Sequence, residues 1–167
     1  EQLAPDSPEV KLLERASSPN AYFIELGVLA HESGVKLPDA TTRWQSSDTE
    51  LAVDKPITLS WNNGAGLHFM RTIAVDDKFM FTVTDSIKND SSAAVTLYPY
   101  GLVSRNYTDT GTHTYFMHEG PLGVTNQVLE DVTYATLRED GAQKYSGSGW
   151  IGMTDKYWLA AIIPENR

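Results

Sequence analysis

The sequence predicts an all-β, antiparallel fold. Runs of β-branched and aromatic residues alternate at short intervals with clusters of Gly, Asn, Asp, Ser and Pro, a rhythm typical of sandwiches built from short strands. Ile57–Trp61 alternates in polarity, and Asn62–Gly66 after it favours a hairpin because Asn-Gly tolerates positive φ. Gly147–Pro164 is rich in tryptophan and aliphatic residues and predicts two core strands joined by a tight turn at Thr154–Lys156.

The N-terminal part of the chain predicts fewer elements. Ser7–Arg15 fits a short helix with Ser7 as N-cap and Pro8 in the first turn, and it fits a strand equally well. We favour the strand because the rest of the chain is β. Ala21–Ala30 predicts a further strand, and Leu37–Asp48 predicts a loop around Trp44.

The middle of the chain predicts a meander of consecutive antiparallel strands. The turns between them are rich in Asn, Asp and Ser. Arg71 interrupts the apolar face of its strand and therefore needs a partner or solvent. Ala94–Arg105 is apolar on both faces in its first half, as expected for a strand buried on both sides. The four strands of this meander are Ile57–Trp61, Leu67–Val75, Phe79–Ile87 and Ala94–Arg105.

The C-terminal third continues the β pattern. Tyr115–His118 and Val128–Tyr134 predict strands, and Arg138–Ser148 predicts a polar, Gly-rich loop. No internal repeat or linker divides the sequence, so we expect a single domain over residues 1–167.

Composition limits the function classes. The 167 residues are 41% apolar, which can fill one core, and the net charge is −9. No basic cluster is present to neutralise phosphate, so we expect no nucleic-acid partner. Cysteine is absent, which excludes disulfides and thiolate metal sites. No signal peptide or membrane span is present, and the chain starts at Glu1 without Met, so we expect a piece of a longer protein.

His118-Glu119 is the first candidate for chemistry. A zinc-protease helix would need a second histidine at position 122, which is Leu, and Gly120-Pro121 disfavours a helix there. The metal interpretation therefore fails. A His-Glu pair can act as acid and base on a sugar, but we favour a strand-end histidine whose ring bonds to a neighbour in the turn.

The remaining motifs carry no catalytic signature. Adjacent carboxylates such as Asp76-Asp77 and Glu130-Asp131 point to opposite faces of a strand and do not converge. We predict no catalytic residue, no cofactor and no metal. Large aromatics predict core packing, with groove lining as the alternative. They are Trp44, Tyr98, Tyr100, Tyr115 and Trp158.

Seven segments, in order along the chain, carry a resemblance to the large periplasmic domain of the bacterial membrane-protein insertase YidC. The strongest is Gly149–Pro164, and the resemblance covers nearly the whole chain. The other six are Asp6–Val10, Gly34-Val35 with Thr42–Gln45, Ile57–Gly64 with Gly66-Leu67, Phe79–Thr84, Leu97–Leu102 with Ser104-Arg105, and His118–Gly123.

This resemblance implies an antiparallel β-supersandwich like that of galactose mutarotase-like enzymes, with this chain as its central part. It implies a location on the periplasmic side of the bacterial inner membrane, in a multi-pass protein whose membrane helices carry out insertion. The implied partners are the Sec translocon, SecF in particular, and inserting membrane proteins. We expect groove or partner contacts at His118, Glu119, Trp44 and Tyr100.

Three functions therefore stand. The first is a non-catalytic module of a membrane-protein insertase and chaperone. The second is a sugar-binding or mutarotase-like enzyme, which requires His118 or His68 to meet a carboxylate in an aromatic-lined cleft. The third is a peptide-binding β-sandwich, which a long exposed edge strand would favour.

Overall fold

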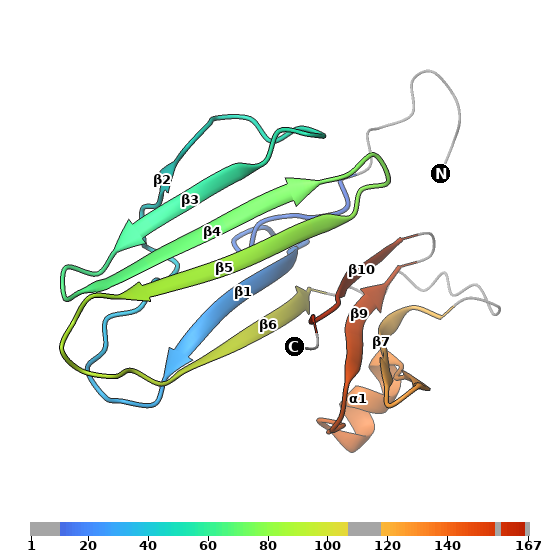
Figure 1. Cartoon of the computed structure of the whole chain (residues 1–167). Helices are drawn as coiled ribbons and strands as arrows, with labels where there is room; N and C mark the ends of the chain where they lie inside the picture. The colour runs from blue at the N-terminus through green and yellow to red at the C-terminus, as the bar shows by residue number, and fades with distance from the viewer. Residues whose placement is uncertain (1–10, 107–117, 156–157, 166–167) are drawn as a thin grey trace. The chain divides into compact units, whose positions relative to one another are not determined.

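The computed structural model describes residues 11–106, 118–155 and 158–165 and divides into two compact units (Figure 1). Unit 1 comprises Glu1–Glu25 and Gly101–Arg167, and unit 2 comprises Leu26–Tyr100. Strands dominate both units, and the strands within each of the two four-stranded sheets pair antiparallel. The predicted all-β, antiparallel class is therefore confirmed.

Unit 2 contains a four-stranded sheet in the order β2-β3-β4-β5. Figure 1 shows β3, β4 and β5 side by side as a meander. The prediction of β4 matches both of its bounds, and the hairpin between β3 and β4 is confirmed. The strands are β2 (Gln45–Ser46), β3 (Ile57–Asn62), β4 (Leu67–Val75) and β5 (Phe81–Asn89).

Alternating polarity explains why this sheet has one apolar face. Trp61 of β3 lies directly opposite Phe69 of β4, and their ring centroids are 5.5 Å apart. Such cross-strand aromatic pairs stabilise a sheet beyond the area they bury. Phe69 is 3% exposed and Leu67 is also buried, so the centre of the core in this sheet lies on β4.

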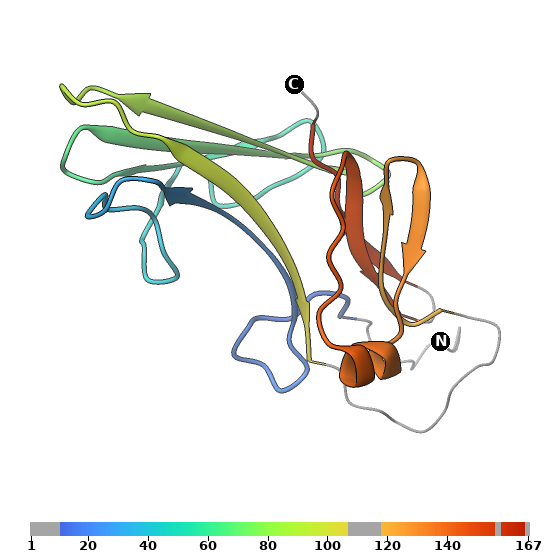
Figure 2. The ribbon, with the colours of Figure 1, turned by 90° about the horizontal axis from the view of Figure 1, so that it is seen from below.

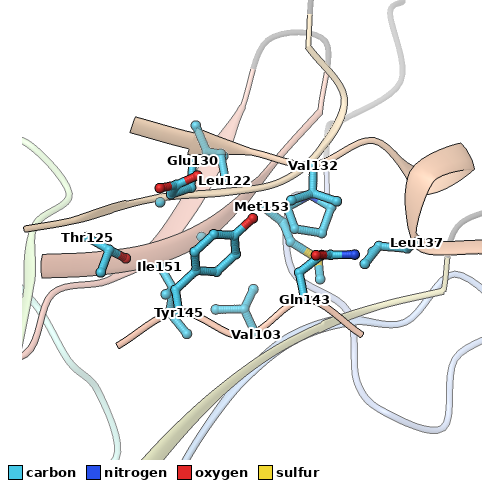
Figure 3. A pocket seen from close by; sticks show the side chains of 13 residues that line it. Val103, Leu122, Thr125, Glu130, Val132, Leu137, Gln143, Tyr145, Ile151 and Met153 are labelled. Atoms are coloured by element: carbon cyan, nitrogen blue, oxygen red, sulfur yellow. The ribbon is translucent and has the colours of Figure 1, made fainter. Parts of the chain in front are cut away.

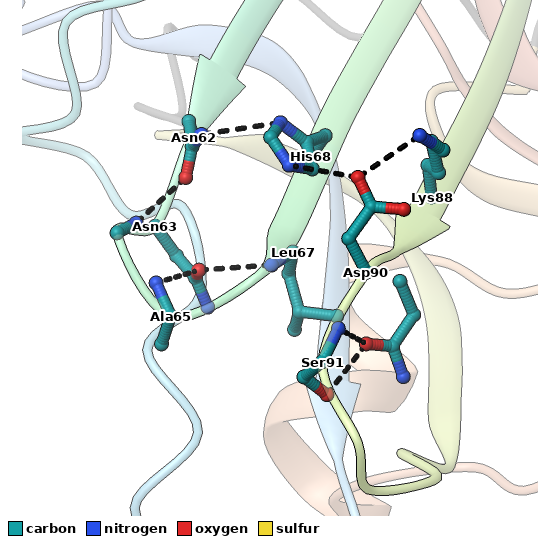
Figure 4. A network of polar contacts seen from close by, with 10 residues as sticks. Asn62, Asn63, Ala65, Leu67, His68, Lys88, Asp90 and Ser91 are labelled. Atoms are coloured by element: carbon teal, nitrogen blue, oxygen red, sulfur yellow. Dashed lines mark hydrogen bonds and ion pairs between the residues drawn. The ribbon is translucent and has the colours of Figure 1, made fainter.

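Side chains of the loop 62–66 fix the turn between β3 and β4 (Figure 4). The buried Asn63 accepts bonds at Oδ1 from the backbone N–H groups of Ala65 (2.7 Å) and Leu67 (3.0 Å). Gly64 and Gly66 have φ of 77° and 94°, a region that glycine adopts without strain. Asparagine and glycine at these positions therefore set the register of the hairpin.

Unit 1 contains a second four-stranded sheet, in the order β10-β9-β7-β8. The two strands predicted within Gly147–Pro164 are confirmed as β9 and β10, with Thr154 opposite Leu159. Residues 156–157 of the predicted turn lie outside the described residues. The elements are β7 (Gly120–Thr125), β8 (Val128–Asp131), α1 (Tyr134–Asp140), β9 (Gly149–Thr154) and β10 (Leu159–Ile162).

A small core lies against this second sheet. Tyr22, Val103 and Ala160 form its buried centre, and Leu12, Ile24, Met153 and Ile162 pack around them. The Tyr22 hydroxyl donates to the carbonyl of Met153 at 2.7 Å. Figures 1 and 2 place α1 at one end of β7 and β9.

β1 (Tyr22–Ala30) and β6 (Leu97–Arg105) form a separate two-stranded sheet. The prediction of β1 is confirmed, but placing Ala94–Arg105 in the meander was wrong, since β6 pairs with β1 and not with β5. Burial on both faces was also wrong, because Tyr98–Leu102 are exposed. β6 has one neighbouring strand in its sheet, whereas a central strand has two. Fewer neighbours therefore cover its side chains.

Other predicted elements need correction. Phe79 is not in a strand but in the turn before β5, with φ of 61°. Leu37–Asp48 is a loop except for the short β2. Tyr134 begins helix α1 instead of ending a strand, and α1 takes the first residues of the predicted loop Arg138–Ser148. β7 was not predicted at all.

Two predicted strands fall partly outside the described residues. Of Ser7–Arg15, residues 11–15 are described, and Glu14 forms only an isolated bridge with Tyr22. Of Tyr115–His118, only His118 is described, and it lies in an irregular segment before β7. His118 is therefore not a strand residue.

Candidate functional site

His118 lies in unit 1, where the chain enters β7. Its Nε2 lies 3.1 Å from the carbonyl oxygen of Pro121, and its Nδ1 lies 3.9 Å from Oδ2 of Asp131. A carbonyl oxygen only accepts, so Nε2 carries the proton that forms this bond. The expected bond from the histidine ring to a neighbour in the turn is thus present. Glu119 follows and is half-buried.

His68 lies in unit 2 at the start of β4 (Figure 4). Its Nδ1 lies 3.1 Å from Nδ2 of Asn62, and its Nε2 lies 3.4 Å from Oδ2 of Asp90. Lys88 Nζ binds the same carboxylate oxygen at 2.9 Å. The imidazole therefore accepts from the amide and faces a carboxylate that a lysine already neutralises.

Trp44, which directly precedes β2, lies against a charged pair on the sheet of unit 2. The guanidinium carbon of Arg71 lies 6.0 Å from the Trp44 ring centroid. Arg71 also makes a two-pronged contact with Asp85, with Nε–Oδ1 at 2.6 Å and Nη2–Oδ2 at 2.8 Å. The partner that Arg71 was expected to need is therefore Asp85, and the Trp44 ring lies beside the same guanidinium.

Tyr100 of β6 covers a glycine on the neighbouring strand. A Cβ atom added to Gly27 of β1 would overlap the Tyr100 ring and its hydroxyl. The ring therefore occupies the space that a side chain at position 27 would fill. Tyr100 is exposed on its other side, and so are Tyr98 and Trp158, which corrects the expectation that these aromatics are core residues.

The four predicted contact residues fall into two separate groups. Trp44 and Tyr100 belong to unit 2, and His118 and Glu119 belong to unit 1. Each unit therefore carries two of the four predicted contact residues. His118 lies 3.9 Å from the Asp131 carboxylate and His68 lies 3.4 Å from the Asp90 carboxylate, and both carboxylates are exposed to solvent.

Unit 1 also contains a pocket of about 230 Å³ over the sheet strands β7 and β9 (Figure 3). Its walls are mainly aliphatic, from Val103, Leu122, Val132, Leu137 and Ile151, with Met153 at the same surface. Tyr145, Gln143, Glu130 and Thr125 add polar atoms. Neither His118 nor His68 lines it.

This pocket suits a small apolar group more than a reaction. Its volume is close to that of one large side chain, and most of its lining lacks polar atoms. The sequence did not predict it, because β7 and α1, which supply five lining residues, were not recognised. Leu122 and Val124 alternating after Pro121 were the available signal.

Perturbed ionisable groups do not cluster at the pocket. Burial raises the pKa of the Tyr22 phenol above its ordinary value. Hydrogen bonds lower the pKa of three carboxyls on the surface of unit 2: from backbone Thr96 for Glu32, from the Thr41 hydroxyl for Asp39, and from Lys55 for Asp48. None of these four groups lines the pocket of unit 1.

Within residues 11–106, 118–155 and 158–165, no group of three or more His, Asp or Glu residues is arranged to hold a metal ion. The single helix of these ranges, α1, is seven residues long, and no helix there is long and apolar enough to cross a membrane.

Comparison with known proteins gives a consistent result. A family model described as YidC periplasmic domain matches residues 1–167. The membrane protein insertase YidC of Methylobacterium nodulans is 43% identical over 178 residues, covering 100% of this chain and 29% of the relative. That of Granulibacter bethesdensis is 41% identical over 167 residues, covering 96% of this chain and 29% of the relative.

The membrane protein insertase YidC of Rickettsia felis is 38% identical over 167 residues, covering 99% of this chain and 30% of the relative. The chain thus spans about three-tenths of the length of these curated relatives. No solved structure shows a significant match. Since the family model matches along the whole sequence and the relatives share this identity, the chain belongs to the YidC periplasmic domain family.

Proposed function

We propose that the chain is a non-catalytic periplasmic module of a membrane-protein insertase and chaperone. The observation that carries this proposal is the family match over residues 1–167, with relatives named membrane protein insertase YidC. In this proposal the longer protein is a multi-pass inner-membrane protein, its membrane part inserts client proteins, and residues 1–167 form the central part of one larger β-supersandwich domain.

We also propose that this module contacts the Sec translocon, SecF in particular, as the family resemblance implies. The proposed contacts are Trp44 and Tyr100 on unit 2, and His118 and Glu119 on unit 1. Exposed aromatic residues such as Tyr100 suit a protein interface, because they bury a large area with few rotatable bonds.

Binding of the 167-residue chain to the purified periplasmic part of SecF tests this contact by titration calorimetry. We expect saturable binding that Tyr100→Ala weakens by about tenfold, as for an interface anchor. Ser92→Ala is the control, because Ser92 is exposed, lies in the turn after β5 and is not aromatic. Equal losses in both variants, or no binding by the wild-type chain, would contradict the proposal.

A sugar-active enzyme is the alternative that the two His–carboxylate pairs leave open. Polarimetry with common aldoses tests it directly. We expect anomer exchange at the uncatalysed rate, because His118 bonds to a backbone carbonyl and His68 faces a carboxylate already bound by Lys88. Catalysed exchange that His118→Gln or His68→Gln abolishes would establish the enzyme instead.

A further inference from the structure

β5 (Phe81–Asn89) is an edge strand of the sheet in unit 2. In the described part of the chain its ladder partner is β4, and all nine of its residues are exposed. Figure 1 shows it as the outer strand of the meander, as long as β4 beside it. A strand of this length with one unpaired side is a ready template for another strand.

Two backbone bonds give the phase of the ladder between β4 and β5. Asp76 N–H donates to the Met80 carbonyl at 3.1 Å, and Asp90 N–H donates to the Gly66 carbonyl at 2.8 Å. The register between these ends is unbroken. In an antiparallel ladder the backbone N–H and C=O groups of alternate residues bond to the partner strand. The backbone groups of the even-numbered residues of β5 therefore face β4. The backbone groups of Phe81, Val83, Asp85 and Ile87 therefore point to the open side.

β5 lacks the features that protect natural edge strands. It contains no proline and no bulge interrupts its register with β4. Its two charged residues are already compensated: Asp85 binds Arg71 at 2.6 Å, and Lys88 binds Asp90 at 2.9 Å. Neither charge is therefore left to repel an approaching apolar strand.

The side chains at this edge define what an added strand would carry. Phe81 is 56% exposed and shares one face of β5 with the exposed Val83 and Ile87. Thr82, Thr84 and Ser86 occupy the other face. An added strand matches both faces when apolar residues alternate with threonine or serine, since like residues make the best cross-strand pairs.

Charge favours a basic occupant over a second copy of this chain. Each copy carries a net charge of −9, so self-association works against mutual repulsion. Asp76, Asp77 and Lys78 lie in the turn before β5 and give it a net charge of −1, so lysine or arginine beside the added strand would approach this turn favourably. A cationic segment is therefore the complementary partner.

We propose that β5 binds an extended segment of a partner polypeptide as an added strand, with apolar side chains at alternate positions and a basic residue at the end that lies beside Asp76 and Asp77. This inference rests on the geometry of β5 and is independent of the proposed contact with SecF. Backbone hydrogen bonds to β5 would provide the affinity for the added strand, and the exposed side chains of Phe81, Val83 and Ile87 would provide the selectivity.

Fluorescence anisotropy with a labelled peptide tests the proposal. The probe alternates valine and threonine, has a lysine at each end and matches the nine residues of β5. A second peptide of the same sequence is N-methylated at alternate residues, which removes the donors of one edge. We expect saturable binding of the first peptide and about tenfold or greater weakening for the second, because backbone bonds are lost.

Variants of β5 provide matched controls. Val83→Pro removes a backbone N–H that faces the open side and leaves the hydrogen bonds to β4 in place. It should therefore weaken binding of the first peptide by about tenfold or more. Val83→Thr keeps this N–H and should bind within about threefold of the wild-type chain. A peptide with glutamate at each end should bind more weakly than the lysine peptide at low salt.

Several results would overturn the proposal. They are an absence of saturable binding, equal affinity for the two lysine peptides, and unchanged affinity in Val83→Pro. A dimer of the wild-type chain that Val83→Pro dissociates, without peptide binding, would make a second copy the occupant. If Val83→Pro fails to fold, as judged by circular dichroism, the comparison of the two peptides on the wild-type chain still decides.

Discussion

Glycine residues in the second sheet show how single positions fix its packing. At Gly149, which has φ of 155°, an added Cβ would overlap the backbone carbonyl of Val124 on β7. At Gly123 an added Cβ would lie 2.5 Å from the Trp150 carbonyl. Backbone atoms cannot swing aside as a flexible side chain can, so glycine at these positions allows β7 and β9 to pair closely.

We therefore predict that Gly149→Ala lowers the free energy of unfolding by about 3 kcal/mol or more, because the strands must separate to accept the methyl group. Gly34→Ala is the control. Gly34 has φ of 81° with open space around it, so only backbone strain of about 1–2 kcal/mol applies. Urea unfolding measures both, and equal effects would contradict the account of β7–β9 packing.

Exposure separates two large aromatic residues that look alike in the sequence. The sequence predicts a loss of 3–5 kcal/mol for Trp158→Ala if the ring is in the core. Trp158 is 41% exposed, so we now predict a loss of about 1–2 kcal/mol. Phe69→Ala, at a buried position, should cost about 3–5 kcal/mol. A larger loss of unfolding free energy for Trp158→Ala than for Phe69→Ala in urea would contradict a surface position of Trp158.

Tyr22 predicts sensitivity to alkaline pH. Burial raises the pKa of its phenol, so the folded state favours the neutral form. The resulting stability is fully present below the unfolded pKa of about 10 and is lost as pH rises through the folded value. The free energy of unfolding should therefore fall less steeply above about pH 10 in Tyr22→Phe than in the wild-type chain. An identical slope for both proteins would contradict this.

At the scale of elements, strands with strict alternation and distinct turns were predictable. β4 follows an Asn-Gly turn and precedes an Asp-rich turn, and both of its bounds were found. β9 and β10 were found because their aromatic and aliphatic runs have no helical period. Local sequence was sufficient where the turn chemistry and the alternation agree.

β7 was missed because its sequence contains Gly120 and Pro121, which normally indicate a turn. Val132 N–H donates to the Pro121 carbonyl at 2.9 Å, just beyond the last pair of β7 with β8. The missing proline N–H thus faces the end of β8, where the ladder stops. β6 pairs with β1, which lies about seventy positions earlier in the chain. Local sequence patterns carry no information about pairing over such a distance.

Adjacent positions of β5 give a test of its ladder. Thr84→Pro removes an N–H that faces β4 and should cost about 3 kcal/mol or more. Val83→Pro removes an N–H that faces the open side and should cost less than about 1 kcal/mol. Urea unfolding of the two variants measures the difference. The reverse order would show that the ladder has the opposite phase.

At the scale of the molecule, the candidate site was predictable only in part. The sequence indicated that Arg71 needs a partner and that the His118 ring bonds within its turn, and both are observed. The pocket of unit 1 was not predicted, since its lining residues come from β6, β7, β8, α1, β9 and the segments after β8 and before β9. A pocket assembled from segments distant in sequence leaves no local motif.

Membership in the family rests on the whole sequence, not on one motif. The family model matches residues 1–167, and the curated relatives are about three times as long. We therefore propose a binding role for this chain within a larger insertase. Its candidate binding surfaces are exposed aromatic residues and an open strand edge, and neither surface requires a reactive group.

Photocrosslinking in the full-length insertase, in its native membrane, tests this binding role most directly. A photoreactive amino acid replaces Tyr100 in one variant and Gly34, an open loop position, in a control. The account predicts a crosslink to SecF from position 100 and none from position 34. Absence of a SecF crosslink at position 100, or equal crosslinking from both positions, would contradict it.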